Sequence, residues 1–170
     1  MSLKFTASPT GKFSGPGFTA RCALGKGGVV TASQKREGDG ASPVGVWPVR
    51  NVFYRPDRVE PPVTSLPLVP LKPYDGWCDA ANHPLYNRPV SLPFAASHEK
   101  LWRDDHVYDV IVELGYNDDP VEAGRGSAIF LHLARGGLAP TAGCVAVPWA
   151  AMISLLGHLS QASVIDIALN

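Results

Sequence analysis

The amino-acid sequence predicts a mostly β fold with mixed sheets and one or a few short helices. Glycine and proline are abundant, with 17 and 16 of the 170 residues, and both favour turns and short strands over long helices. The apolar and charged fractions, 45% and 18%, are typical of soluble globular proteins. A chain of this length is sufficient for one domain with its own hydrophobic core.

Three segments alternate apolar and polar residues with the two-residue period of a half-buried strand, namely 17–24, 107–117 and 163–170. Residues 46–54 are rich in β-branched and aromatic side chains, which strands favour. Residues 127–134 are apolar except for His132, as in a central strand covered on both faces. Strands therefore account for most of the predicted regular structure.

One clear helix is predicted at residues 148–157. Proline suits the first position of a helix and glycine its end, as Pro148 and Gly157 do here. Between them, apolar residues recur with helical spacing at Trp149, Met152, Ile153 and Leu156.

Residues 55–106 are rich in proline, which rules out long helices and central strands there. A short helix is expected at residues 97–103, with Ser97 as its N-cap. A long irregular stretch inside a compact domain is usually functional. We therefore expect a flexible N-terminal segment at residues 1–16 and a single domain at 17–170, in which 55–106 form an irregular insertion or lid.

Charge and hydropathy exclude several classes of partner. The formal net charge is zero, so neither a nucleic acid nor an anionic membrane is indicated. No run of about 18 apolar residues is present, which excludes an integral membrane helix. The N-terminus also lacks the apolar stretch of a secretory signal, so the chain as given is expected to be soluble. That expectation does not by itself place the protein in a compartment.

The cysteines and histidines do not indicate a disulfide framework or a metal site. The three cysteines, Cys22, Cys78 and Cys144, are odd in number and far apart, so at least one thiol should be free. Cys22 lies on the apolar face of residues 17–24 and is expected to be a small core residue. No close spacing of metal ligands occurs, and we expect no metal or other cofactor.

His132 and Cys144 stand out because packing requires neither of them. His132 shares a strand face with Phe130, while Leu131 and Leu133 point the other way. Each residue has an ordinary interpretation, a hydrogen-bonded core histidine or a small buried thiol. The loop between them is long enough for the side chains to meet, and Gly143 allows successive amides to point at one oxyanion.

Such a pair has the components of cysteine acyl transfer. A thiol is mostly protonated at neutral pH, and a cationic imidazole beside it would hold it as thiolate. The dipole of the helix that begins near Pro148 would favour the same ionised form. Amides at Gly143 and Cys144 would stabilise a tetrahedral intermediate by roughly 3 kcal/mol per hydrogen bond.

At these residues the sequence resembles L,D-transpeptidases with a YkuD-type domain. In that family a His precedes a loop ending in Ser/Thr-x-Gly-Cys, which this chain matches with His132, Thr141, Gly143 and Cys144. A second stretch, Ser-Pro-Val-Gly-Val-Trp at residues 42–47, resembles the family's Thr-Pro-x-Gly-x-aromatic segment. The resemblance covers roughly residues 17–169.

The chain also departs from the usual pattern of the family. Leu133 replaces the glycine that commonly follows the first histidine, and Ala142 replaces a second motif histidine. Ala146 stands where an Arg or Asn is often found. The nucleophile and base carry over, whereas the usual substrate contacts do not. The Thr-x-Gly-Cys variant is similar to a proteobacterial subgroup, some members of which form 1,3 cross-links.

The resemblance implies a YkuD-like β-sandwich and a two-step reaction on peptidoglycan stem peptides. Cys144 would form an acyl-enzyme with a donor stem, and an amine of a second stem would resolve it to a cross-link. The likeness to the Thr-x-Gly-Cys subgroup adds 1,3 cross-links to the linkages that the resemblance implies. His132 would act as the base, held by a backbone carbonyl such as that of Leu133. The resemblance further implies exchange of D-amino acids, acylation by carbapenem-type inhibitors, and work in the periplasm as a monomer.

Substrate contacts are predicted from residue type. The stem carries carboxylates, for which arginine is the natural bidentate partner, so Arg88 and Arg103 are candidates, with Tyr86 and Trp102 as walls. Thr141 is a further candidate from the motif. Each arginine has the alternative role of a solvated surface charge. Two other functions stay open, an L,D-carboxypeptidase or endopeptidase that uses water, and a peptidoglycan-binding domain with an unreactive Cys144.

Overall fold

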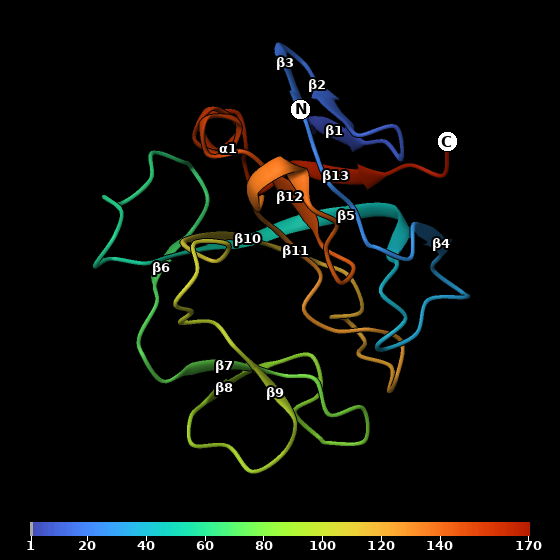
Figure 1. The fold of residues 1–170 in the computed structure, drawn as a ribbon, viewed down its shortest axis with the longest axis vertical. Coiled ribbons are helices and arrows are strands. Elements are labelled where there is room, and N and C mark those ends of the chain that lie inside the picture. The colour runs from blue at the N-terminus through green and yellow to red at the C-terminus, as the bar shows by residue number, and fades with distance from the viewer. Residues whose placement is uncertain (1) are drawn as a thin grey trace.

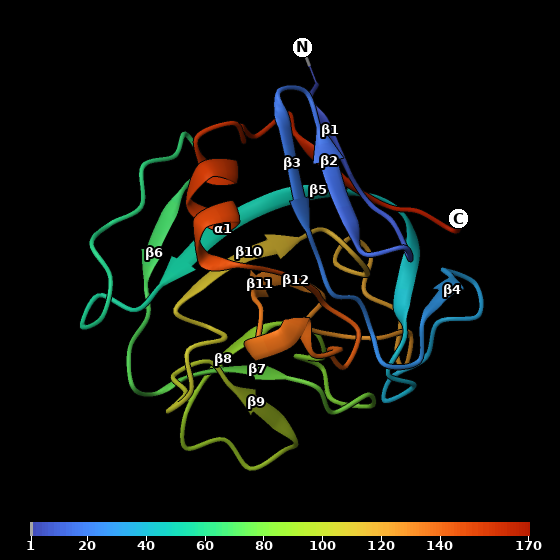
Figure 2. The same cartoon turned by 45° about the horizontal axis from the view of Figure 1, so that its top comes forward.

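A computed structural model describes residues 2–170. Most of its strands form one mixed sheet of ten strands, and a single short α-helix packs against it. Figures 1 and 2 show the helix on one side of this sheet and a small three-stranded sheet on the other. The mostly β fold with mixed sheets and one short helix is therefore confirmed. No helix within residues 2–170 has the length and hydropathy to span a bilayer.

The main sheet is assembled from segments at both ends of the chain. In spatial order its path runs through β12 (Val145–Val147), β11 (Phe130–Leu133), β10 (Val110–Leu114), β5 (Ser42–Tyr54), β13 (Val164–Ile167), β1 (Lys4–Ala7), β2 (Lys12–Gly15) and β3 (Phe18–Arg21). Two further short strands, β4 (Val29–Thr31) and β6 (Leu68–Pro70), pair in parallel with β5. The long strand β5 thus joins both halves of the sheet, as its curved arrow in Figure 2 shows.

The N-terminal segment is part of the core, so the expectation that residues 1–16 are flexible is wrong for the described residues 2–16; Met1 lies outside them. Strand β1 pairs in parallel with β13 and antiparallel with β2. Phe5 and Phe13 are fully buried and stack with ring centroids 6.3 Å apart. Burying two aromatic rings stabilises this end by several kcal/mol, which outweighs the low regularity of such short strands.

The helix α1 (Trp149–Leu156) begins after Pro148 and ends at Gly157, close to the predicted bounds. Its buried face differs from the predicted one, because Met152, Leu155 and Leu156 are buried. Trp149 and Ile153 are 49% and 40% exposed. The buried face is rotated by about 60° from the predicted stripe, which brings Leu155 into the core and leaves Trp149 and Ile153 outside it.

The proline-rich segment 55–106 contains a second sheet. Its three antiparallel strands lie in the order β8 (Pro89–Ser91), β7 (Asp75–Cys78) and β9 (His98–Lys100). Strand β9 occupies the region where a helix at 97–103 was predicted, so that prediction is wrong. The cap signal of Ser97 is local, whereas pairing of His98 with Cys78 across the sheet and burial of Leu101 favour the extended chain.

Two hydrophobic clusters lie on the two faces of β11. Leu131 and Leu133 pack in the cluster that includes α1, whereas Phe130 packs in the cluster that includes Trp77 of β7. The predicted alternation along residues 129–133 is therefore confirmed. Because His132 is two residues from Phe130, its side chain faces the small sheet.

Candidate active site

Strand register places Cys144 and His132 on one face of the main sheet. Strands β11 and β12 are parallel, with His132 opposite Ala146 and Leu131 opposite Val145. Cys144 precedes Ala146 by two residues, so it lies on the same face as His132, next to Phe130. Two residues along a strand span about 6.6 Å. The thiol and the imidazole are therefore close neighbours on the floor of one site.

The loop between the two strands returns the chain for this parallel pairing. It contains a short 3-10 turn, η1 (Gly136–Leu138), and ends in the turn that carries Gly143. Gly143 has φ +140°, and a Cβ there would lie 2.9 Å from the carbonyl oxygen of Ala41. Only glycine fits this close approach without strain. The Gly-Cys step is thus required by backbone geometry as well as by chemistry.

Thr141 shapes this turn from within. Its hydroxyl donates to the carbonyl oxygen of Cys144 at 2.7 Å and accepts the amide hydrogen of Gly143 at 3.1 Å. The Gly143 amide is therefore hydrogen-bonded within the turn in this conformation. The Cys144 amide donates to no acceptor within residues 2–170, which leaves it available to an oxyanion.

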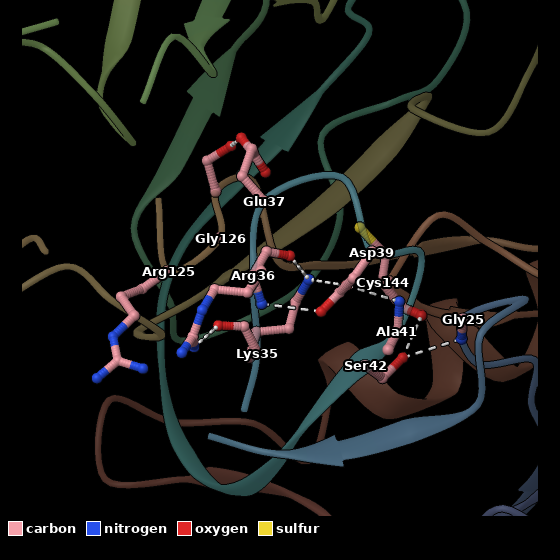
Figure 3. Close-up of polar contacts among 12 residues, drawn as sticks. Gly25, Lys35, Arg36, Glu37, Asp39, Ala41, Ser42, Arg125, Gly126 and Cys144 are labelled. Carbon is pink, nitrogen blue, oxygen red and sulfur yellow. Dashed lines mark hydrogen bonds and ion pairs between the residues drawn. The ribbon is translucent and has the colours of Figure 1, made fainter. Parts of the chain in front are cut away.

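The upstream motif supports the nucleophile from behind. Ser42 donates from its hydroxyl to the Cys144 carbonyl at 3.4 Å and accepts the amide hydrogen of Gly25 at 2.9 Å. In the preceding loop, Lys35 donates to Asp39 at 2.5 Å, and Asp39 also accepts the amide hydrogen of Ala41 at 2.9 Å. Figure 3 shows these contacts around Cys144. The two sequence motifs therefore meet at one backbone turn.

His132 is oriented by its own neighbour in the chain. Nδ1 lies 2.9 Å from the carbonyl oxygen of Leu133. A carbonyl only accepts hydrogen bonds, so Nδ1 carries the proton and Nε2 is the free basic nitrogen of the neutral ring. The Tyr108 ring packs edge-on against the imidazole, with centroids 5.3 Å apart. The role predicted for the Leu133 carbonyl matches this geometry.

Burial disfavours the charged forms of both the Cys144 thiol and the His132 imidazole. Burial, with a smaller contribution from Glu99, raises the pKa of Cys144 to about 12. Burial, opposed by the hydrogen bond to the Leu133 carbonyl and assisted by the positive charges of Arg135 and Arg103, lowers the pKa of His132 to about 4. Desolvation therefore disfavours the expected resting pair of thiolate and imidazolium.

The sulfur is held by backbone groups in this state. It donates to the carbonyl oxygen of Ala128 at 3.1 Å and accepts from the amide of Phe130 at 3.4 Å. It makes no direct hydrogen bond to His132, and strand β12 separates it from the start of α1. Cys144 is 8% exposed. The helix dipole is therefore too far from Cys144 to stabilise its thiolate as predicted, since the effect fades within one helical turn.

A cavity of about 440 Å³ opens above this face and contains both candidate catalytic side chains. Of the predicted substrate contacts, Thr141 and Arg103 line it. Arg103 binds Asp105 through Nε and Nη2, at 2.8 and 2.6 Å. This ion pair fixes the guanidinium, and Nη1 has no hydrogen-bond partner within residues 2–170.

Three other predicted contacts lie outside this cavity. Tyr86 is buried, and its hydroxyl accepts the amide hydrogen of Gly126 at 2.9 Å. Arg88 is exposed and donates to the backbone of Asp118 at 2.7 Å. The guanidinium of Arg55 stacks over the ring of Trp102, with the Arg55 Cζ atom 3.7 Å from the ring centroid. These side chains serve local structure, so residue type alone was a poor guide to them.

Several charged residues of the cavity were not predicted. They are Lys35, Glu37, Asp79, Glu99 and Arg135, together with the buried Tyr108. They come from five separate segments, and no short motif joins them. Only the position of Arg135, three residues after the motif histidine, carried a local signal. The cavity is consequently much more charged than the 127–147 stretch suggested.

The arrangement has the parts that acyl transfer at a carbonyl carbon requires. Its parts are a shielded thiol, a neutral imidazole with a free Nε2, and one unoccupied backbone amide beside the sulfur. No group of three or more His, Cys, Asp or Glu side chains among residues 2–170 is arranged to hold a metal ion. The chemistry open to these residues is therefore nucleophilic attack assisted by a general base.

Comparison with known proteins agrees with this chemistry. No curated protein and no solved structure matches the chain. The family model of the L,D-transpeptidase catalytic domain, YkuD, matches residues 11–167, which is most of the 170-residue chain. The match includes both sequence motifs, the strands that carry them and the turn at Gly143. The chain therefore belongs to the YkuD family of L,D-transpeptidase catalytic domains.

Proposed function

We propose that this protein is a cysteine-dependent L,D-transpeptidase that cross-links peptidoglycan stem peptides through an acyl-enzyme on Cys144. The observation that carries the proposal is the placement of Cys144 and His132 on one strand face inside one cavity. The imidazole there is oriented with Nε2 free. Membership of the family supports the same reaction class.

In the first step, the thiol proton passes from Sγ to Nε2 of His132 while the sulfur attacks a carbonyl carbon of the donor stem. The sulfur must leave the carbonyl of Ala128 as it does so. The leaving amine then takes the proton from the imidazolium, and a thioester to Cys144 remains. Because burial disfavours the thiolate and the imidazolium at rest, proton transfer in this proposal accompanies attack.

In the second step, an amine of the acceptor stem attacks the thioester carbonyl. His132 accepts a proton from that amine, the carbon–sulfur bond breaks, and the proton returns to the sulfur. In both steps the negative oxygen of the tetrahedral intermediate would accept a hydrogen bond from the backbone amide of Cys144. One such donor contributes roughly 3 kcal/mol of transition-state stabilisation.

Finer features of the function follow from the resemblance in the motif. The Thr-x-Gly-Cys variant favours 1,3 cross-links, and the same acyl-enzyme permits exchange of D-amino acids. Carbapenem-type compounds would acylate Cys144, since a strained amide carbonyl presents the same electrophile to the sulfur. Peptidoglycan lies outside the cytoplasmic membrane, so we place the activity of the monomer in the periplasm.

Purified protein incubated with tetrapeptide muropeptides tests the proposal, with products followed by mass spectrometry. We expect cross-linked dimers and a transient mass increase on Cys144. The Cys144→Ala variant should form neither product. Cys22→Ala is the matched control, because Cys22 is a buried core thiol outside the cavity, and it should retain the activity.

The products also separate the alternatives. Shortened stems without dimers would replace the transpeptidase by an L,D-carboxypeptidase or endopeptidase, in which water resolves the same acyl-enzyme. Binding of muropeptides with no change in their mass and no adduct on Cys144 would leave only a peptidoglycan-binding domain. Position 1,3 or 3,3 of a cross-link is read from fragmentation of the dimer.

A further inference from the structure

Asn87 lies between β7 and β8 in the segment 55–106, and its side chain is buried. Its Oδ1 accepts hydrogen bonds from the indole of Trp77 at 2.9 Å and from the backbone amide of Ala128 at 3.0 Å. Its Nδ2 donates to the carbonyl oxygens of Tyr116 and Asn117, at 3.1 and 2.7 Å. A side-chain amide has two donors and an oxygen with two lone pairs, so every polar group of this side chain is used. Asn87 therefore joins the small sheet to the chain that precedes β11.

Ala128 has a backbone conformation that alanine rarely adopts. Its φ is +53°, in the left-handed region, which is disfavoured about five- to thirtyfold for an L-residue with a Cβ atom. Asn87 also has a positive φ, +55°, but asparagine is one of the residues that tolerate this region. A strained conformation persists only where its surroundings hold it. The hydrogen bond from the Ala128 amide to Asn87 is such a restraint, and that amide donates to no other acceptor within residues 2–170.

The strained residue contacts the candidate nucleophile directly. The Cys144 thiol donates to the carbonyl oxygen of Ala128, 3.1 Å from Sγ, whereas the Phe130 amide donates to the sulfur at 3.4 Å. A hydrogen bond from the thiol stabilises its protonated form, and a hydrogen bond to the sulfur stabilises the thiolate. Relaxation of Ala128 to a negative φ would turn its carbonyl away from the sulfur. The thiol would then lose the contact that favours its protonated form.

We infer that Asn87 is a positioning residue for the nucleophile, because it holds Ala128 in the left-handed conformation that keeps the Ala128 carbonyl on the Cys144 thiol. Asn87 itself lies outside the cavity, so it acts only through Ala128. The segment 55–106 thereby controls the reactivity of a cysteine that follows it by almost 40 residues. This inference rests on the proposed function of Cys144 as the nucleophile and deepens it.

Alkylation by iodoacetamide at about pH 8 tests the inference, with the modified fraction of each cysteine-containing peptide followed by mass spectrometry. Asn87→Gly removes the side chain but permits the positive φ. It should raise the alkylation rate of Cys144 about two- to tenfold, as loss of one hydrogen bond does. Asn87→Asp is the matched variant, because it retains the acceptor for the Ala128 amide and loses only the donors. Cys144 should react no faster in Asn87→Asp than in the parent protein.

Ala128→Gly has the opposite expectation. Glycine adopts a positive φ without strain, so the carbonyl should stay on the thiol more of the time, and Cys144 should react up to about fivefold more slowly. This variant removes no hydrogen bond, so it keeps the test decisive if thermal unfolding shows that Asn87→Gly does not fold. A faster reaction of Cys144 in Ala128→Gly would overturn the inference. Asn82→Gly, at an exposed asparagine of the same segment, should change nothing.

The other two cysteines are internal controls. Cys78 accepts the backbone amide hydrogen of Asn87 at its carbonyl, at 2.9 Å, and reports on opening of the small sheet, whereas Cys22 lies in the main core and reports on global unfolding. Acceleration of either thiol in parallel with Cys144, equal acceleration by Asn87→Gly and Asn87→Asp, or no change in any variant would overturn the inference. A selective response of Cys144 in a protein that forms no product from muropeptides would overturn the proposed reaction and leave this inference standing.

Discussion

Alkylation of Cys144 by iodoacetamide should be slow in the free protein and should rise about tenfold per pH unit up to at least about pH 10. Burial, with Glu99 nearby, raises the pKa of Cys144 to about 12, against about 8.5 for an exposed thiol. At pH 7 the thiolate fraction falls from about 3% to about 0.001%, roughly 3,000-fold. The more basic thiolate is about 25- to 60-fold more nucleophilic. The net expectation is a rate roughly 100-fold below that of an exposed thiol.

The assay is site-specific, because the chain has three cysteines. Aliquots taken over time are digested, and the modified fraction of the peptide that contains Cys144 is quantified by mass spectrometry between about pH 6 and pH 10. The chain unfolded in urea is the matched control. There the same Cys144 is exposed and should react with an ordinary pKa, reaching a plateau above about pH 9.

A plateau of the folded protein at or below about pH 7 would refute the reasoning. It would mean that the thiol is ionised beside a cationic imidazole, so that the electrostatics of the pair prevail over desolvation. A pH-independent rate near zero would instead mean that the 8% exposure of Cys144 blocks the reagent. Access and ionisation are distinguished because only ionisation depends on pH.

Three further outcomes are expected. Acylation of Cys144 by a carbapenem should persist down to about pH 5 and fall as the pH drops through about 4. Burial lowers the pKa of His132 to about 4, and only the neutral imidazole accepts a proton. A midpoint of the acylation rate near pH 6.5, with the fold intact by circular dichroism, would contradict this. Gly143→Ala should destabilise the protein by about 1–3 kcal/mol in thermal unfolding, since its Cβ would lie 2.9 Å from the Ala41 carbonyl, whereas Gly136→Ala meets open space and should be nearly neutral. Phe5→Ala should lower the free energy of unfolding by about 3–5 kcal/mol, because Phe5 is fully buried. A change as small as that of the exposed control Lys12→Ala would instead support a flexible N-terminal segment.

The fold was predictable wherever the signal is local. The alternation around His132 identified the two faces of β11, and Pro148 and Gly157 bounded the helix within a residue. Strands β1 and β2 were missed because four residues each are too few to show a period. Their stability comes from pairing with β13, roughly 160 residues away in sequence. Such pairing leaves no trace in a local pattern.

The site was predictable to the same extent. His132, Gly143 and Cys144 were identified because a strand, a turn and a nucleophile need those residue types in that order. Of the predicted substrate contacts, only Arg103 and Thr141 line the cavity, and the Thr141 hydroxyl is already hydrogen-bonded within the turn. Asp79 and Glu99 went unnoticed, since nothing in their neighbourhoods distinguishes them from surface charges.

The sequence by itself determined the strand that carries the base, the glycine turn that carries the thiol, and the family to which both motifs point. These features depend on period, backbone freedom and residue order, all of which are local. Only the tertiary structure revealed that burial disfavours the charged thiolate and imidazolium and that carboxyl side chains line the same cavity. Ionisation depends on desolvation and on charges supplied by distant segments, and those are known only once the chain is folded.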